Sequence, residues 1–265
     1  MNNFFTRIIS AIIYAALFIF SILFSKESYV GLLTVFSGIC IWEFSRIVQS
    51  KTVLLLIPVL ISTIFLFFFK VIDTDVLFYF LVFCILHSLY LIIDLYSKNY
   101  IVRNTIVKFF TSFSYILLPF LFLIFLPFIK GIYEPNVIIY VILIIWTNDS
   151  FAYLVGKNYG KHKLFERISP KKTIEGFIGG LLFSIMVGLL IGKYSKLFTM
   201  LDWAIIATLV SIFGTFGDLV ESKFKRQANV KDSGKIMPGH GGLLDRLDSL
   251  FFLAPFVYLY IHYCI

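Results

Sequence analysis

The sequence predicts an all-α, polytopic integral membrane protein with about nine transmembrane helices, its amino terminus cytoplasmic and its carboxyl terminus outside. Three observations lead to this fold class. Hydrophobic residues make up 60% of the 265 positions and charged residues 14%, with a mean hydropathy of +0.94, which is more apolar surface than one soluble core can bury. Apolar runs close to the roughly 20 residues that cross a bilayer recur along the chain. Lysine and arginine are divided unevenly between the segments that separate these runs.

The apolar runs are long and unbroken, which favours helices over a transmembrane barrel, whose strands are short and alternate in polarity. A helix satisfies its own backbone hydrogen bonds in lipid, so we expect each run to form one spanning helix. The first run is expected to be a helix and not a signal peptide, because no small-x-small cleavage site follows it and eight further runs do. The predicted spans are residues 7–24, 29–48, 53–71, 77–97, 105–128, 136–156, 176–195, 202–222 and 245–264.

The charges between the runs predict the orientation. With the amino terminus inside, 18 of the 23 lysine and arginine residues fall in inner segments, and the formal net charge of +8 reports topology first. Such an excess follows the positive-inside rule. The outer segments then hold Lys26, Lys70, Lys130, Lys193 and Lys196. We therefore expect a multi-pass protein of the cell membrane, with its polar connectors at the cytoplasmic face and no nucleic-acid partner.

The chain divides into two regions of different character. Residues 1–135 are expected to be transmembrane helices joined by short connectors. Residues 136–265 are expected to form the catalytic transmembrane region, because two long basic cytoplasmic connectors, 157–175 and 223–244, lie within them.

Three polar residues fall inside predicted spans of the first region: Glu43, His87 and Asp94. An acid at mid-bilayer costs roughly 2.5–3.5 kcal/mol on insertion scales, so each of these residues invites a functional explanation. Contacts between helices explain them equally simply. The sequence favours such contacts and leaves the three roles open.

Two pairs of carboxylates flank the second connector. Asp218 and Glu221 are three residues apart at the end of one predicted span, and Asp245 and Asp248 are three apart at the start of the last. Residues three apart share a helix face, so each helix can present two carboxylates to the other. Facing pairs repel unless cations lie between them, and Mg²⁺ prefers such oxygen ligands. All four are therefore candidate metal ligands. Under the alternative, nearby bases neutralise the acids as ion pairs: Lys225, Arg226 and Arg246.

The second connector ends in the glycine-rich segment Pro238-Gly239-His240-Gly241-Gly242. Glycines allow backbone N–H groups to turn inward on an anion, and the start of the following helix adds a positive dipole end. We expect His240, Gly241 and Gly242 to bind a phosphate. The alternative is a plain turn that needs glycine and proline for its shape.

The first connector is also basic. Asp149 lies at the inner end of the preceding span, and bases recur through 157–163 and in Ser169-Pro170-Lys171-Lys172-Thr173. These bases either bind phosphates or simply form a cytoplasmic surface. The segment 156–162 approximates a P-loop, but its spacing is one residue short and His162 replaces the Ser or Thr that would hold magnesium, so this motif is excluded.

Carboxylates for a divalent metal, together with bases and glycines for phosphates at the inner lipid boundary, indicate phosphoryl or nucleotidyl transfer to a lipid head group. The segment 222–248 resembles the signature of the phosphatidate cytidylyltransferase (CDP-diacylglycerol synthase) family. The matching residues are Ser222-Lys223-Phe224-Lys225-Arg226, Lys231-Asp232-Ser233-Gly234 and Pro238-Gly239-His240-Gly241-Gly242-Leu243-Leu244-Asp245-Arg246-Leu247-Asp248. Further similarity lies in Gly217-Asp218-Leu219 with Glu221-Ser222, in Asp149 with Ala152-Tyr153, and in Ile168–Thr173 with Glu175-Gly176.

The resemblance implies a phospholipid-biosynthetic reaction in which CTP and phosphatidic acid give CDP-diacylglycerol and pyrophosphate, assisted by Mg²⁺ and compatible with a second, monovalent cation such as K⁺. The lipid phosphate would attack the α-phosphorus of CTP in line. The expected partners are CTP, phosphatidic acid, the lipid bilayer and a second copy of the chain in a homodimer. The predicted catalytic residues are Asp218, Asp245, Asp248, Lys225, Arg226 and Arg246. The predicted substrate-binding residues are Asp149, Ser169, Lys171, Lys172, Thr173, Ser222, Lys231, Asp232, His240, Gly241 and Gly242.

Two rival functions remain at this stage. One is a related enzyme that uses another lipid phosphate, such as an archaeal ether lipid. The other is a transporter in which intramembrane acids form an ion path, but transporters of that kind carry matching halves with interrupted helices. Here the polar residues crowd into one half, which favours the enzyme.

Overall fold

Helices dominate the fold, and the strands in the described part of the chain form two short antiparallel hairpins. The structure is a computed structural model that describes all residues except 1–2, 69–73, 98–103, 238 and 240. The helices are α1 (Asn3–Phe24), α2 (Lys26–Ile47), α3 (Leu56–Phe68), α4 (Thr74–Asp94), α5 (Thr105–Ser112), α6 (Leu118–Phe125), α7 (Pro135–Tyr159), α8 (Ile174–Tyr194), α9 (Met200–Gln227) and α10 (Leu244–Tyr263). A 3₁₀ turn, η1 (Lys51–Leu55), precedes α3, and a π turn, η2 (Phe113–Leu117), joins α5 to α6. The hairpins are β1 (Phe128–Ile129) with β2 (Ile132–Tyr133), and β3 (Lys163–Phe165) with β4 (Ser169–Thr173).

Six helical segments of the described residues are long and apolar enough to cross a membrane: Lys26–Ile47, Asp75–Asp94, Thr105–Phe125, Pro135–Tyr159, Ile174–Tyr194 and Met200–Gln227. Two further apolar helical segments, Ile9–Phe24 and Lys51–Leu66, are shorter. The predicted class, an all-α multi-pass membrane protein, is therefore confirmed by helix length and composition. α10 carries Asp245, Arg246 and Asp248 in its first two turns and is not among these segments.

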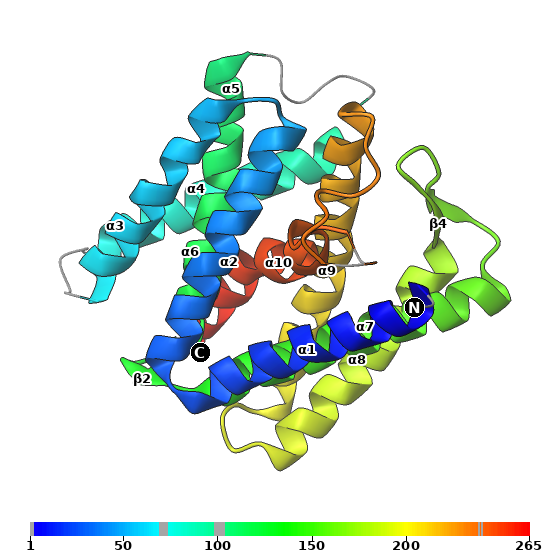
Figure 1. Ribbon diagram of the computed structural model, residues 1–265. Coiled ribbons are helices and arrows are strands. Elements are labelled where there is room, and N and C mark those ends of the chain that lie inside the picture. Colours follow the sequence, from blue (N-terminus) through cyan, green and yellow to red (C-terminus); the bar gives the residue numbers. More distant parts are fainter. Residues whose placement is uncertain (1–2, 69–73, 98–103, 238, 240) are drawn as a thin grey trace.

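The described helices follow the predicted spans but differ at the ends that flank the connectors. α9 runs to Gln227, five residues past the predicted end at 222, so Lys225 and Arg226 lie on a helix and not on a connector. The i,i+4 ion pair between Glu221 and Lys225 stabilises this extension. The connector 157–175 is shortened at both ends and contains the β3–β4 hairpin, which projects from the helices in Figure 1.

Close packing of α7, α8 and α9 depends on small residues, as is common between membrane helices. A Cβ added to Gly180 of α8 would lie 2.8 Å from the backbone oxygen of Asn148 on α7. A Cβ added to Gly188 would lie 2.6 Å from the backbone oxygen of Trp203 on α9. α8 therefore lies against both neighbours at backbone distance.

α10 packs against α9 and α6 and also contacts α2, so it lies between elements from both halves of the chain (Figure 1). Aromatic rings fill this region: Phe251 stacks on Phe120 with ring centroids 5.1 Å apart, and Phe213 stacks on Phe256 at 3.4 Å. This packing fixes where the acids of α9 and α10 lie.

Candidate active site

The last turns of α9 present three charged side chains toward α10. Asp218, Glu221 and Lys225 follow one another at helical spacing, and Glu221 is fully buried. The Ser222 hydroxyl donates to Oδ1 of Asp218 at 3.2 Å, one turn away on the same helix. The Lys225 ammonium donates to Glu221 and, at 2.5 Å, to Oδ1 of Asp245 on α10. Lys225 therefore ties the two helices together through their carboxylates.

Asp218, Glu221 and Asp248 form a compact group of acids across the α9–α10 interface. One carboxylate oxygen from each lies within 4.8 Å of the others. Asp248 is 7% exposed, and the Ser249 N–H donates to its Oδ1 at 2.7 Å. This is a donor set that a metal ion can occupy, and it contains three of the four predicted ligands.

The acid group is not neutralised by its neighbouring bases. Lys172 pairs with Asp218 at 2.6 Å and Lys225 pairs with Glu221 and Asp245. Arg246 lines a cavity together with Asp218, Asp245 and Asp248. When Asp245 is counted with the acid group, three bases therefore lie near four acids. Glu221 Oε1 is buried with no hydrogen-bond partner among the described residues, and a buried unpaired carboxylate oxygen is costly. A cation among these oxygens fits that vacant acceptor.

Asp245 is held differently from the other three acids. Its Oδ1 accepts from Lys225, and its Oδ2 accepts the Gly242 N–H at 2.8 Å and the Ser233 N–H at 2.9 Å. The Ser233 hydroxyl lies 3.0 Å from the same oxygen. Both oxygens of Asp245 are thus engaged by the protein, and its role as a metal ligand stays a prediction.

The glycine-rich turn binds one of the protein's own carboxylates. The Gly242 N–H, predicted to face a phosphate, donates to Asp245. Gly241 has a φ of +95° and pairs with Met237 through a backbone hydrogen bond of 3.0 Å. A Cβ at Gly241 would lie 2.7 Å from Asp245 Oδ2, so glycine is required there for conformation and clearance. His240 lies outside the described residues, and phosphate binding by this turn stays a prediction.

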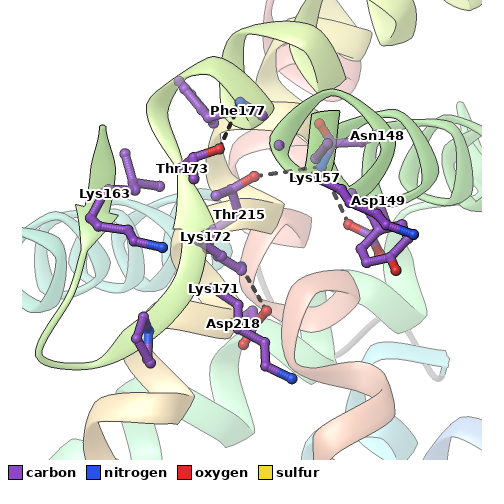
Figure 2. Close-up of a pocket in the computed structure, with 16 residues that line it drawn as sticks. Asn148, Asp149, Lys157, Lys163, Lys171, Lys172, Thr173, Phe177, Thr215 and Asp218 are labelled. Carbon is purple, nitrogen blue, oxygen red and sulfur yellow. Dashed lines mark hydrogen bonds and ion pairs between the residues drawn. The ribbon is translucent and has the colours of Figure 1, made fainter. Parts of the chain in front are cut away.

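A basic cavity of about 630 Å³ lies between the β3–β4 hairpin and α7. Figure 2 shows Lys172 reaching from the hairpin to Asp218, with Asp149 of α7 across the cavity. Four lysines line it: Lys157, Lys163, Lys171 and Lys172. Thr173, at the end of β4, caps α8 by accepting the Gly176 N–H at 3.1 Å.

A second cavity, of about 600 Å³, adjoins the first, because Asp149 and Asp218 line both. Its charged lining includes the acids of α10 and Lys225, with Arg246 and Asp232. Its apolar side comes from α1 and α7: Ala11, Tyr14, Ala15, Ile145 and Trp146. Asp218 therefore lies where a basic cavity meets one with an apolar wall, and Asp245 and Asp248 line the second cavity.

The β3–β4 hairpin is held in place by contacts that could not be predicted from the sequence. Glu175 accepts the Lys161 N–H at 3.1 Å and lies 2.6 Å from His162 Nδ1. The Arg167 guanidinium donates to the backbone oxygens of Leu95 at 3.2 Å and Ser97 at 2.5 Å. These bonds join the hairpin to the start of α8 and the end of α4, and so position Lys171 and Lys172.

The other predicted residues are spread around this centre. Lys231 and Asp232 are exposed on the connector after α9, Ser169 begins β4, and the Arg226 guanidinium lies 3.4 Å from the backbone oxygen of Val230. Arg226 also lies 3.5 Å from the backbone oxygen of Ile168. Their catalytic and binding roles stay predictions.

The three intramembrane polar residues of the first half have different surroundings. Asp94 forms a buried ion pair of 2.5 Å with Lys223 of α9. Glu43 bonds to the segment before α10. Nε2 of His87 is buried without a hydrogen-bond partner among the described residues. Contacts between elements thus explain why Asp94 and Glu43 are charged residues inside predicted spans. The charge within a span is the feature of the sequence that marks both residues as unusual.

Comparison with known proteins adds to this geometry. The model of the cytidylyltransferase family matches residues 5–264. The chain belongs to this family. The cytidylyltransferase is 33% identical over 263 residues to the phosphatidate cytidylyltransferase of Bacillus subtilis (strain 168), a match that covers 95% of each chain.

Higher identity is confined to a part of other relatives. The chain is 55% identical over 120 residues to the phosphatidate cytidylyltransferase of Staphylococcus aureus (strain COL), which covers 44% of this chain and 46% of that protein. The corresponding protein of Staphylococcus epidermidis (strain ATCC 12228 / FDA PCI 1200) is 52% identical over 119 residues. The matched segment spans less than half the length of these two relatives.

Proposed function

We propose that this cytidylyltransferase family member is a phosphatidate cytidylyltransferase, which makes CDP-diacylglycerol and pyrophosphate from CTP and phosphatidate. The observation that carries the proposal is the acid group Asp218, Glu221 and Asp248, of which Asp218 lines both cavities and Asp248 lines the second. The Bacillus subtilis relative, which matches this chain over nearly its full length, is a phosphatidate cytidylyltransferase.

We assign the nucleotide to the basic cavity. A triphosphate carries several negative charges, and the four lysines that line this cavity supply the complementary charge. Lys172 lies at its inner end, beside Asp218. The triphosphate would therefore lie with its α-phosphate toward the acids, and Lys157, Lys163 and Lys171 would face its outer phosphates.

We assign the lipid phosphate to the second cavity. Its wall from α1 and α7 is apolar and continues along helices that are exposed to lipid, with Leu17 at 46% and Trp146 at 51% exposure. Arg246 and Lys225 line the polar end and can receive an anionic head group. The lipid would then enter from the bilayer while the nucleotide enters from the aqueous side.

The donor set suits Mg²⁺, because it consists of carboxylate oxygens, and one oxygen of Glu221 accepts no hydrogen bond from the described part of the chain. When bound, Mg²⁺ would neutralise the phosphate charges and stabilise the departing pyrophosphate. Asp218, Glu221 and Asp248 would hold it, and the excess of acids leaves room for a second, monovalent cation such as K⁺.

The reaction needs positioning more than acid–base chemistry. Phosphomonoesters have a second pKa near 6, so the lipid phosphate is already an anion at neutral pH. One of its oxygens forms a bond to the α-phosphorus of CTP, and the bond from that phosphorus to the bridging oxygen of the β-phosphate breaks, so pyrophosphate leaves with the electron pair. Lys172, Lys225 and Arg246 would hold the two anions against their mutual repulsion.

We further propose that the site faces the cytoplasm, where CTP is found. Four contacts join the segments at this end of the helices: Glu43 with Leu244, Lys223 with Asp94, Arg167 with Ser97, and Lys108 with Gln49. The positive-inside rule directs these connectors to the cytoplasm. The proposal includes nine spans with an inner amino terminus and an outer carboxyl terminus, and a homodimer.

Turnover of defined substrates tests the function. The purified protein in detergent is incubated with CTP, Mg²⁺ and either phosphatidic acid or an ether-lipid phosphate, and release of pyrophosphate and formation of the CDP-lipid are measured. The proposal expects phosphatidic acid to be consumed in one-to-one ratio with CTP. Consumption of the ether-lipid phosphate alone supports the rival enzyme, and ion flux in vesicles without any CTP turnover supports a transporter.

Orientation and assembly are tested separately. Single cysteines placed at exposed positions near Lys171 and near Lys196 should label from opposite sides of the membrane in oriented vesicles. Labelling of both from one side contradicts the proposed topology. The mass of the protein in detergent, measured by light scattering, distinguishes a homodimer from a single chain.

A further inference from the structure

Glu43 is a buried acid from the half of the chain that supplies none of the acid group. It lies on the last turns of α2 and is fully buried. Its Oε1 accepts the Leu243 N–H at 3.2 Å, and its Oε2 accepts the Leu244 N–H at 2.8 Å. Both donors belong to the start of α10, about 200 positions later in the chain.

The start of α10 has no capping side chain of its own. Leu243 occupies the N-cap position and makes no side-chain capping bond. The first N–H groups of a helix need acceptors, and a carboxylate there also interacts favourably with the helix dipole. Glu43 supplies both from another helix, so the position of α10 depends on α2.

Glu43 is also linked to Asp245 through one hydroxyl group. The Ser233 oxygen lies 3.1 Å from Glu43 Oε2 and 3.0 Å from Asp245 Oδ2. Together the two carboxylates receive the N–H groups of Ser233, Gly242, Leu243 and Leu244. The connector is therefore folded around two buried anions of the protein.

Two glycines of the connector provide the space for Glu43. A Cβ at Gly234 would lie 2.1 Å from Glu43 Oε1, and a Cβ at Gly242 would lie 2.6 Å from the same oxygen. Neither glycine has a positive φ. At Gly242 the Ser233 hydroxyl oxygen would lie still closer to the added Cβ, at 2.0 Å. Clearance for the Glu43 carboxylate explains glycine at position 234, and clearance for Glu43 together with Ser233 explains it at position 242, without any phosphate.

We propose that Glu43 is a positioning residue for the acid group: it fixes the connector and the first turn of α10, and through them the places of Asp245 and Asp248. Asp248 follows Leu244 by one helical turn, so any rotation or fraying of the start of α10 moves it relative to Asp218 and Glu221. The consequence for activity rests on the proposed function, whereas the geometric claim does not.

Replacing Glu43 with glutamine removes the negative charge and keeps the shape of the side chain. In Glu43→Gln one oxygen remains to accept one N–H, but the amide NH₂ faces the other donor, so one bond is lost and two donors oppose each other. Tyr29→Phe is the matched control. Tyr29 is fully buried on the same helix and donates to the backbone oxygen of Leu123 at 2.6 Å, away from the connector.

The full-length proteins are compared by hydrogen exchange and by binding of Mn²⁺ as the metal probe. Loss of a charge-assisted bond should speed exchange of the Leu243 and Leu244 amides by about 10-fold or more in Glu43→Gln. Mn²⁺ affinity should fall by about 10- to 100-fold, as is typical when a group that orients ligands is removed. Tyr29→Phe should leave both quantities at the wild-type value although it lowers thermal stability.

A third variant keeps the test informative when Glu43→Gln does not fold. Ser233→Ala removes the shared hydroxyl but keeps the backbone bond to Asp245, so Mn²⁺ affinity should fall in the same direction by a smaller factor. The proposal is overturned when Glu43→Gln behaves like Tyr29→Phe in exchange and Mn²⁺ binding, or when Ser233→Ala binds Mn²⁺ like the wild type. A wild-type protein that converts no phosphatidate contradicts the proposed function instead, and the exchange and Mn²⁺ comparisons remain decisive for Glu43.

Discussion

Replacing Lys172 with methionine tests the assignment of the nucleotide to the basic cavity. The Lys172 ammonium lies 2.6 Å from Asp218 Oδ2 and its side chain is 28% exposed, so it lies at the inner end of the cavity. Methionine keeps most of the side-chain volume and removes the charge. The expected loss is one hydrogen bond to a charged phosphate, about 1.5–3 kcal/mol, which corresponds to a fall of about 10- to 150-fold in kcat/KM for CTP.

The same variant should not weaken metal binding. Lys172 competes with a cation for Asp218, so its removal leaves that carboxylate more available. Mn²⁺ affinity in Lys172→Met should equal or exceed the wild-type value. This opposite response of CTP kinetics and metal binding separates a phosphate-binding lysine from one that merely neutralises an acid.

Steady-state kinetics with varied CTP provides the assay, and Lys161→Met is the matched control. Lys161 lies on the same connector and is exposed, but it does not line the cavity. The control should keep kcat/KM within about twofold of the wild type, as expected for a surface charge. Equal values of kcat/KM in the two variants would refute the assignment of CTP to this cavity.

Two further predictions concern packing. Lys223→Met leaves Asp94 buried without its partner at 2.5 Å. This variant should lower the free energy of unfolding by about 3–5 kcal/mol, measured by reversible unfolding in detergent micelles. Recovery of stability in the double variant with Asp94→Leu supports the mechanism, and an unchanged stability of the single variant contradicts it. Gly180→Ala places a Cβ 2.7 Å from Asn148 Oδ1 and should cost about 1–3 kcal/mol through overpacking, whereas Gly38→Ala, which meets nothing within 4 Å, should not lower the melting temperature.

Local periodicity explains what could be predicted from the sequence. Long apolar runs predict the helices, and the spacing of Asp218 and Glu221 predicts that these two acids share one helix face. Residues at i and i+3 must share a face in any helix, so this part did not depend on tertiary structure. The same spacing puts Asp245 and Asp248 on one face of the next helix, and a cation between the two faces was the hypothesis that brought the pairs together. The structure places Asp248 beside Asp218 and Glu221.

Long-range contacts explain what could not be predicted. Glu43 was recognised as unusual, but nothing in the sequence indicated that its partners were the N–H groups of Leu243 and Leu244. The sequence predicts that the Gly242 N–H binds a phosphate, because glycine-rich turns often bind anions. The structure gives it the anion of Asp245 instead, and choosing between an internal and an external anion requires the fold.

The extended end of α9 has a similar origin. The sequence predicts a connector at Lys225, because charged residues usually mark the end of a membrane span. The buried acids Glu221 and Asp245 compensate the Lys225 charge and allow the helix to continue. The proposed division at residue 135 remains a prediction, and the bonds of Glu43 to α10 join the two sides of it.

The central claim is that carboxylates from α9 and α10 hold one divalent cation between them. Mn²⁺ binding to the purified protein, measured by electron paramagnetic resonance, tests it most directly in Asp248→Asn, which preserves shape and the bond from the Ser249 N–H. Glu27→Gln, with a side chain 72% exposed on the far end of α2, is the control. The account predicts a loss of affinity of at least about 10-fold in Asp248→Asn and none in the control; equal Mn²⁺ affinity in both variants and the wild type would contradict it.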